Sequence, residues 1–164
     1  MMAQKHRIAV LLHNIRSAHN VGSIFRTADG AGAERVYLSG YTPAPIDAYG
    51  RPQPDIAKTA LGAEQAVDWE KHVSASYFLD RLKHEGWQIV GVEQDDRARD
   101  YRTFRLTKPT VFLFGNEVRG LSPALRKECH ALVEIPMHGM KESLNVSVAA
   151  GIALFAARSN EIEA

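Results

Sequence analysis

The chain has 164 residues, a length typical of one domain, and its 45% hydrophobic and 24% charged residues are ordinary for a globular protein. A net charge of +1 excludes global attraction to polyanions, so a nucleic-acid role would need a local basic patch, for which residues 1–40 have a bias. The single cysteine excludes an internal disulfide, and the scattered histidines lead us to expect no metal. The apolar runs are too short for a membrane span or signal peptide, so we expect a cytoplasmic location.

Predicted strands and helices alternate along the first part of the chain. Continuous apolar runs predict buried strands at residues 8–12 and 36–38. Residues 20–31 predict a helix, with Asn20 as a plausible cap. The proline-rich residues 40–57 predict an irregular loop. Tyr41 and Tyr49 in that loop could stack on a base, but we expect ordinary loop residues there.

The middle of the chain continues the alternation. Residues 57–63 predict a short helical element, and residues 66–69 a short strand. A helix is predicted over 72–85 and a strand over 88–92. Residues 93–108 carry both signs of charge and predict a loop that contains at most one turn. The inward side chains expected for the helix are Val73, Tyr77, Leu79 and Leu82.

The last third predicts two strands and two helices. Residues 110–114 predict a strand, and Ser122 followed by Pro123 is a strong start signal for a helix reaching about residue 129. A closing strand at 132–136 leads to a helix from Ser143 that is apolar nearly all round and should be buried on most sides. Alternating strands and helices favour an α/β fold with a mainly parallel sheet flanked by helices.

Three strand-to-loop junctions combine polar side chains with glycine. They are residues 16–26 (RSAHNVGSIFR), 114–122 (FGNEVRGLS) and the stretch opening at residue 135 (IPMHGMKESLN). Strand carboxyl ends are where ligands bind in parallel α/β sheets. Each junction taken alone has an ordinary structural explanation: a helix cap, a glycine turn or a solvated arginine.

Taken together, the three junctions resemble motifs one, two and three of the SpoU (TrmH-like) family of SPOUT RNA methyltransferases. The match covers nearly the whole chain in the family's order and spacing. The resemblance implies a C-terminal deep trefoil knot, S-adenosylmethionine as cofactor, a homodimer, and 2′-O-methylation of ribose in RNA, tRNA rather than rRNA. Two alternatives stay open: an idle RNA-binding module on this fold, and a nicotinamide-dependent enzyme, which the missing glycine fingerprint disfavours.

The resemblance also implies roles for individual residues. Arg26 falls on the family's catalytic arginine and Asn20 is its motif partner; both would approach the cofactor of the other subunit, and Ser143 and Asn145 complete the catalytic set. RNA would meet Arg16, His19 and Arg26. The cofactor would contact Val92, Gly115, Asn116, Glu117, Ile135, Met137, Ser143, Leu144 and Asn145.

Three further expectations follow. Because arginine is effectively always protonated, we expect Arg26 to hold phosphate and stabilise the forming oxyanion rather than act as a base. Only seven residues precede the first predicted strand, so we expect one catalytic domain over residues 1–164 without a separate RNA-binding domain. We expect the last helix to lie at the dimer interface, where Ala153→Arg should weaken the dimer and also lower the stability of the fold.

Overall fold

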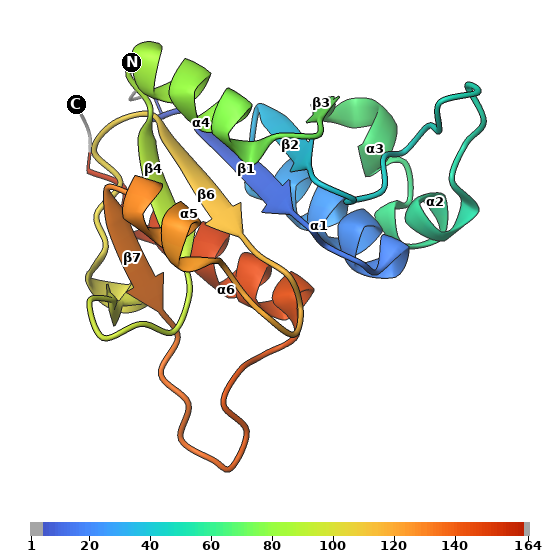
Figure 1. Ribbon diagram of the computed structural model, residues 1–164. Coiled ribbons are helices and arrows are strands. Elements are labelled where there is room, and N and C mark those ends of the chain that lie inside the picture. The colour runs from blue at the N-terminus through green and yellow to red at the C-terminus, as the bar shows by residue number, and fades with distance from the viewer. Residues whose placement is uncertain (1–4, 163–164) are drawn as a thin grey trace.

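The structure, a computed structural model, describes residues 5–162, and in that part of the chain seven strands form one sheet between two layers of helices (Figure 1). All strand pairs are parallel, in the order β3-β2-β1-β6-β4-β7-β5. The strands are β1 (Ile8–His13), β2 (Arg35–Ser39), β3 (Asp68–His72), β4 (Gln88–Val92), β5 (Arg99–Asp100), β6 (Thr110–Phe114) and β7 (Ala131–Glu134). The helices are α1 (Ala18–Gly30), α2 (Pro54–Ala60), α3 (Ala63–Ala66), α4 (Ala75–His84), η1 (Tyr101–Thr103), α5 (Pro123–Glu128) and α6 (Val146–Ser159). The predicted α/β class is confirmed.

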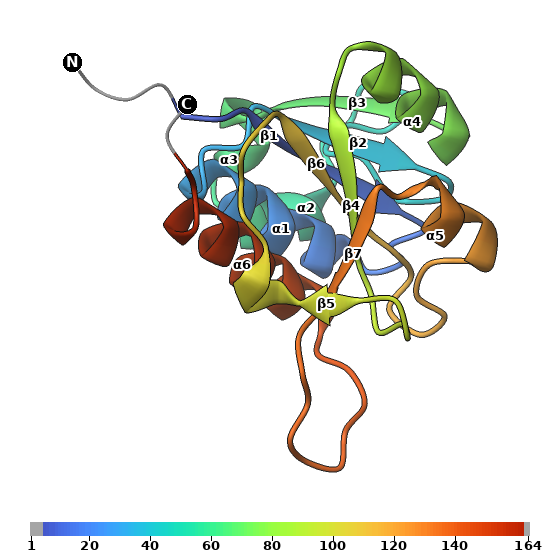
Figure 2. The ribbon, with the colours of Figure 1, turned by 90° about the vertical axis from the view of Figure 1, so that its left-hand side faces the viewer.

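Alternate residues of the central strands fill two cores, one on each face of the sheet. Val10, Leu12 and Phe112 pack with residues of α1, α2 and α6, whereas Leu11 and Leu113 pack with residues of α4 and α5. Figure 2 shows α4 and α5 on one side of the sheet and α1 and α6 on the other. Because both faces are covered, these strands read as continuous apolar runs.

Several predicted boundaries and caps are wrong. Ser17, not Asn20, caps α1, because its hydroxyl accepts a hydrogen bond from the Asn20 backbone N–H at 3.2 Å. The helix predicted over 72–85 begins only after Ser74, so Val73 lies outside it and is exposed. Tyr77 is also exposed, and Phe78 is buried instead.

Two segments predicted as loops contain short regular elements. Within residues 40–57, α2 begins at Pro54, where the fixed φ of proline suits a first helical turn. Residues 93–108 contain the single turn η1, in agreement with the one turn allowed there, and the two-residue strand β5, which was not predicted. Pro54 and the Asp100 cap of η1 are local signals, whereas β5 forms only by pairing with β7, which local sequence does not encode.

Helix α6 starts later than predicted and is buried along one stripe only. Asn145, not Ser143, is its N-cap: the Asn145 Oδ1 accepts hydrogen bonds from the backbone N–H and hydroxyl of Ser147 at 2.8 and 2.6 Å. Val148 and Phe155 are each 49% exposed, so burial on most sides is wrong for the single chain. Ala153 is 4% exposed within its own chain, so Ala153→Arg would disrupt the core and is a poor probe of a dimer. The buried stripe is Val146, Ala150, Ala153, Leu154 and Ala157.

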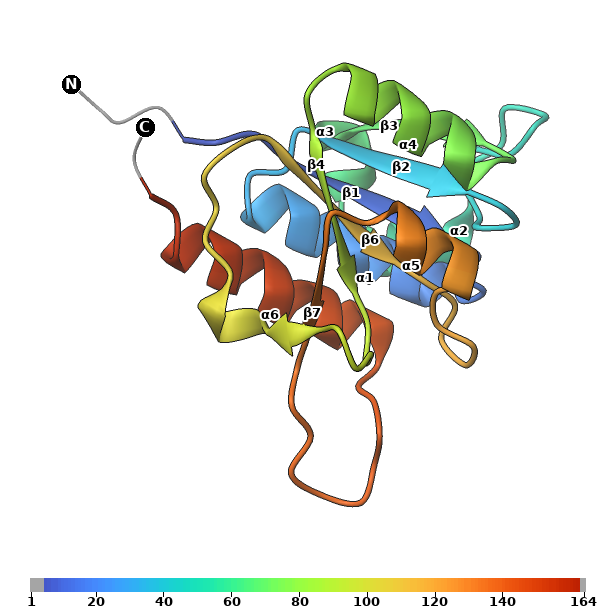
Figure 3. The same ribbon diagram turned by 60° about the vertical axis from the view of Figure 1, so that its left-hand side comes forward.

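The connection from β4 to β6, residues 93–109, passes over the C-terminal end of α6 (Figure 3). The backbone oxygen of Arg102 accepts a hydrogen bond from the Asn160 side chain, and that of Leu106 from the Ile162 N–H, both at 3.0 Å. Helix α6 therefore lies between this connection and α1. Strand order and pairing do not establish the deep trefoil knot, which stays a prediction from the resemblance.

The chain between β7 and α6 leaves the sheet as a long loop that extends from the body of the molecule (Figure 1). This loop carries Ser143 and the exposed side chain of Met140. Among residues 5–162, no helix has both the length and the apolar character needed to cross a membrane.

Candidate functional site

A pocket opens where β4, β6 and β7 end and their following loops begin, the edge at which parallel α/β sheets bind ligands. Most of the predicted cofactor-binding residues line it: Val92, Gly115, Asn116, Glu117, Ile135, Met137, Ser143 and Leu144. Asn145 is not among the lining residues and lies next to them at the start of α6. The fold thus brings two distant junctions of the sequence around one cavity.

Glu117 joins the second junction to the first. Its carboxylate accepts hydrogen bonds from the backbone N–H of Arg16 at 3.0 and 3.1 Å and from that of Ser17 at 3.0 Å. These amides lie at the start of α1, where unpaired N–H groups favour an anion. Burial alone would raise the pKa of Glu117, but these hydrogen bonds outweigh burial and hold the pKa below its ordinary value. Glu117 is therefore ionised at neutral pH and anchors its loop to α1.

Asn20 links Glu117 to the third junction. The Asn20 amide nitrogen donates to Glu117 Oε1 at 3.4 Å, and the Asn20 amide oxygen accepts from Asn145 Nδ2 at 3.3 Å. Asn145 in turn caps α6 through Ser147. One chain of hydrogen bonds therefore connects all three junctions, although Glu117 and Asn20 are 97 residues apart and Asn20 and Asn145 are 125 apart.

Asn116 shapes the second junction with both ends of its amide. The amide oxygen accepts from the backbone N–H groups of Val118 and Arg119, each at 2.9 Å. The amide nitrogen donates to the backbone oxygen of Asn14 at 3.0 Å and to the hydroxyl of Tyr41 at 2.9 Å. Both ends of the Asn116 amide are thus engaged, and its backbone oxygen accepts a further hydrogen bond from the Gly120 N–H at 2.8 Å, so Asn116 holds the shape of the loop.

The same loop closes on itself at two glycines. A Cβ atom at Gly115 would lie 2.5 Å from the carbonyl carbon of Gly120, closer than real Cβ contacts. Gly120 has a φ of +65°, a conformation that L side chains rarely adopt. Both positions therefore require glycine if the loop is to border the pocket in this shape.

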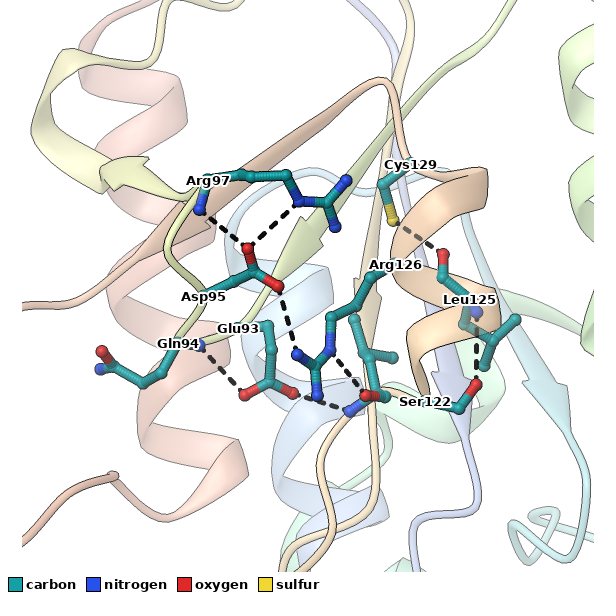
Figure 4. Close-up of polar contacts among 9 residues, drawn as sticks. Glu93, Gln94, Asp95, Arg97, Ser122, Leu125, Arg126 and Cys129 are labelled. Atoms are coloured by element: carbon teal, nitrogen blue, oxygen red, sulfur yellow. Dashed lines mark hydrogen bonds and ion pairs between the residues drawn. The ribbon is translucent and has the colours of Figure 1, made fainter.

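Glu93 and Gln94 also line the pocket, and the three motifs gave no signal for either residue. Glu93 accepts hydrogen bonds from the backbone N–H of Leu121 at 2.7 Å and of Gln94 at 3.0 Å (Figure 4). Beside it, Asp95 accepts one from Arg126 at 3.2 Å, which ties the end of β4 to α5. The position of Glu93, directly after a predicted parallel strand, was the available signal.

The charges around the pocket suit a cation rather than a phosphate. Three of the lining residues are acidic, Glu93, Glu117 and Glu134, and none of the described lining residues is Lys, Arg or His. Apolar side chains such as Ile135 and Leu144 supply flat contact area for an adenine ring. This donor set fits the sulfonium and adenosine of S-adenosylmethionine and does not fit the pyrophosphate of a dinucleotide.

The predicted RNA-facing residues lie outside the pocket. Arg26 is exposed on α1, and among the described residues its guanidinium makes no ion pair or hydrogen bond. The Nε2 atom of His19 lies 3.7 Å from Oδ1 of Asp55 in α2. Arg16 is exposed in the loop that precedes α1. The described part of the chain holds no group of three His, Cys, Asp or Glu side chains placed to share a metal ion.

A model of the SpoU rRNA Methylase family matches residues 7–155. The chain is 33% identical over 150 residues to the 23S rRNA (guanosine-2′-O-)-methyltransferase RlmB of Pseudomonas syringae, covering 92% of this chain and 57% of the relative. The chain therefore spans a little over half the length of that relative.

Two solved structures share the fold. The AdoMet-bound rRNA methyltransferase from Sinorhizobium meliloti superposes with a TM-score of 0.85 at 34% identity, over 97% of this chain and 58% of that one. A structure described as giving insights into 2-OH methylation of C/U34 on tRNA superposes with a TM-score of 0.79 at 26% identity, over 94% of this chain and 96% of that one.

Proposed function

The chain belongs to the SpoU rRNA methylase family, and on that premise we propose that it transfers a methyl group from S-adenosylmethionine to the 2′-hydroxyl of a ribose in RNA. The observation that carries this proposal is the pocket itself, acidic and apolar, with the hydrogen-bond chain Glu117–Asn20–Asn145 uniting the three motifs beside it. Ser143, Leu144 and Asn145 would meet the cofactor from the start of α6.

The main task of the protein in this reaction is to align the methyl donor with the ribose hydroxyl. S-Adenosylmethionine supplies an electrophilic methyl group on a sulfonium centre. The protein must hold the ribose hydroxyl in line with that methyl group and stabilise the charge that develops on oxygen. The oxygen gains the methyl carbon as the carbon–sulfur bond breaks, and the hydroxyl proton leaves to phosphate or water.

Arg26 would act in the site of a second copy of the chain. It is not among the described residues that line the pocket of its own chain, and its guanidinium has no hydrogen bond or ion pair with residues 5–162. An exposed arginine on α1 can reach a neighbouring subunit if α1 and α6 form the contact between two chains, and the half-exposed Val148 and Phe155 of α6 are apolar as such a contact requires. Arg26 would then bind the phosphate beside the target ribose in a bidentate way.

Substitution of Arg26 tests this role. Arg26→Lys keeps the charge but removes the planar fork, and we expect kcat for RNA methylation to fall about 100-fold, as for loss of one oriented transition-state donor. Arg105→Lys, at another exposed arginine outside the pocket, is the control and should retain full activity. An Arg26→Lys enzyme that keeps nearly full kcat would contradict a specific guanidinium role.

Binding of cofactor separates this proposal from its rivals. We expect titration calorimetry to show binding of S-adenosylmethionine and none of NADH, because the pocket offers carboxylates and no cation for a pyrophosphate. Failure to bind S-adenosylmethionine would favour an idle RNA-binding module. Binding of NADH instead would favour a nicotinamide-dependent enzyme.

We propose tRNA rather than rRNA as the substrate. The support is similarity of fold: the structure described as giving insights into 2-OH methylation of C/U34 on tRNA superposes over 94% of this chain with a TM-score of 0.79. Transfer of a tritiated methyl group to total tRNA and to ribosomal RNA, followed by mapping of the nucleotide, tests the choice. Labelled rRNA with unlabelled tRNA would reverse it.

A further inference from the structure

A second cleft shares a wall with the cofactor pocket, and the proposed function leaves most of it unused. The segment formed by Asn116, Glu117 and Val118 borders both cavities. The other residues of the cleft come from the loop before α1, the loop after β2 and the next position of the second motif: Arg16, Ser17, Tyr41 and Arg119. A group bound in this cleft would therefore lie one wall away from the cofactor.

Tyr41 presents a fixed aromatic ring in this cleft. Its hydroxyl accepts a hydrogen bond from Asn116 Nδ2 at 2.9 Å, and its backbone N–H donates to Asn14 Oδ1 at 3.2 Å. Tyr41 as a whole residue is nevertheless 57% exposed. A ring already held in place loses little conformational freedom when a planar partner stacks on it.

Tyr49, in the same irregular loop, is the useful contrast. It is 83% exposed and packs against the guanidinium of Arg51, which lies 4.9 Å from the ring centroid, and it does not line the cleft. Both tyrosines lie in the same loop and the sequence gives no reason to separate them. Of the two, it is Tyr41 that forms a hydrogen bond with Asn116 of the second motif.

Two arginines give the cleft its charge. Arg16 and Arg119 are exposed, and neither guanidinium forms a hydrogen bond or ion pair with the residues between positions 5 and 162. The carboxylate in the cleft, Glu117, is already bound to backbone amides at the start of α1. The two guanidinium groups are therefore available to an anion, and Arg favours phosphate because its donors match phosphate geometry.

We propose that this cleft binds a single-stranded nucleotide of the RNA substrate adjacent to the methylated one, with its base stacked on Tyr41 and its phosphate held by Arg16 and Arg119. The inference rests on the proposed methyltransferase function. An aromatic ring beside paired guanidinium groups is how proteins bind unstacked bases and their backbone, with weak preference among bases. Val118, exposed at the rim, adds apolar contact to the base.

Three tyrosine variants test the stacking contact. Tyr41→Ala should raise KM for RNA about 5- to 100-fold, the range expected for loss of one base–aromatic stack, while the Kd for S-adenosylmethionine stays unchanged. Tyr41→Phe keeps the ring and should recover most of that affinity. Tyr49→Ala is the matched control and should resemble the parent protein. Equal losses in Tyr41→Ala and Tyr49→Ala, or none in either, would overturn the proposal.

Crosslinking gives a readout independent of turnover. RNA containing 5-iodouridine beside the mapped methylation position should crosslink on irradiation to Tyr41, identified by mass spectrometry, and crosslinking only elsewhere would contradict the subsite.

Arg119→Ala tests the phosphate contact. The logarithm of the RNA-binding constant should fall less steeply with the logarithm of salt concentration, by roughly the amount expected for one phosphate contact. If the parent protein methylates RNA and these tests fail, the subsite alone is wrong; if it never methylates RNA, the proposed function fails first.

Discussion

At the scale of single residues, Glu117 determines how the second motif meets α1. Its carboxylate accepts hydrogen bonds from two backbone N–H groups and the Asn20 amide, which lower its pKa. A carboxylate whose pKa is lower in the folded than in the unfolded protein stabilises the fold above its unfolded pKa, and this stability is lost as pH falls through the folded value. Glu117 should therefore contribute at neutral pH and lose its contribution in acid.

Glu117→Gln should lower the free energy of unfolding by about 1 kcal/mol at pH 7, a charged hydrogen-bond contribution reduced by partial exposure. The difference from the parent protein should shrink as pH falls through the folded pKa, because the parent carboxyl then also becomes neutral. Urea unfolding at pH 7 and in a series of acidic buffers measures both. Glu142→Gln, at an exposed glutamate in the long loop, is the control. A pH-independent difference for Glu117→Gln would argue against the anchoring role.

At the scale of elements, α6 has one face in the core of its own chain and another half-exposed. Val148→Glu places a charge on the exposed apolar face, and we expect it to shift a dimer towards monomer without loss of helical circular dichroism. Val73→Glu makes the same change at a valine that is 77% exposed between β3 and α4, so it should leave the assembly unchanged. Sedimentation equilibrium over a range of concentrations measures both. A parent protein that is monomeric throughout would exclude the α1–α6 contact.

At the scale of the whole molecule, cofactor binding should stabilise the entire fold. The pocket is built from the ends of β4, β6 and β7 together with the start of α6, so an unfolded chain has no equivalent site. S-Adenosylmethionine at 100 times its Kd should then raise the free energy of unfolding by about 2.7 kcal/mol. Thermal unfolding with increasing cofactor tests this, with NADH as the control. Equal shifts from both compounds would indicate nonspecific stabilisation.

The sequence by itself determined most of the strands and the longer helices, though not all of their boundaries, and it identified the motif residues. Apolar runs such as residues 110–114 mark strands because a doubly covered sheet buries both faces, and Ser122–Pro123 marks the start of α5 because those residues suit a helix start locally. The resemblance of three short motifs then identified eight residues that line one pocket. These signals are local, so one sequence is enough to find them.

Only the tertiary structure decided which residues those elements bring together. Ser17, rather than the predicted Asn20, caps α1. The Asn20 side chain therefore forms hydrogen bonds with Glu117 and Asn145 instead. Glu93 lines the pocket because segments far apart in the chain meet there. Tyr41 differs from Tyr49 because its hydroxyl bonds to Asn116 of the second motif. The Ser17 cap is a local contact, but the other contacts join residues far apart in the chain: 28 residues for Glu93 and Leu121, and 75 to 125 for the hydrogen bonds of Tyr41 with Asn116, Asn20 with Glu117 and Asn145 with Asn20. Such contacts leave no periodicity or spacing in the sequence, and the residues become neighbours only when parallel strands align their carboxyl ends.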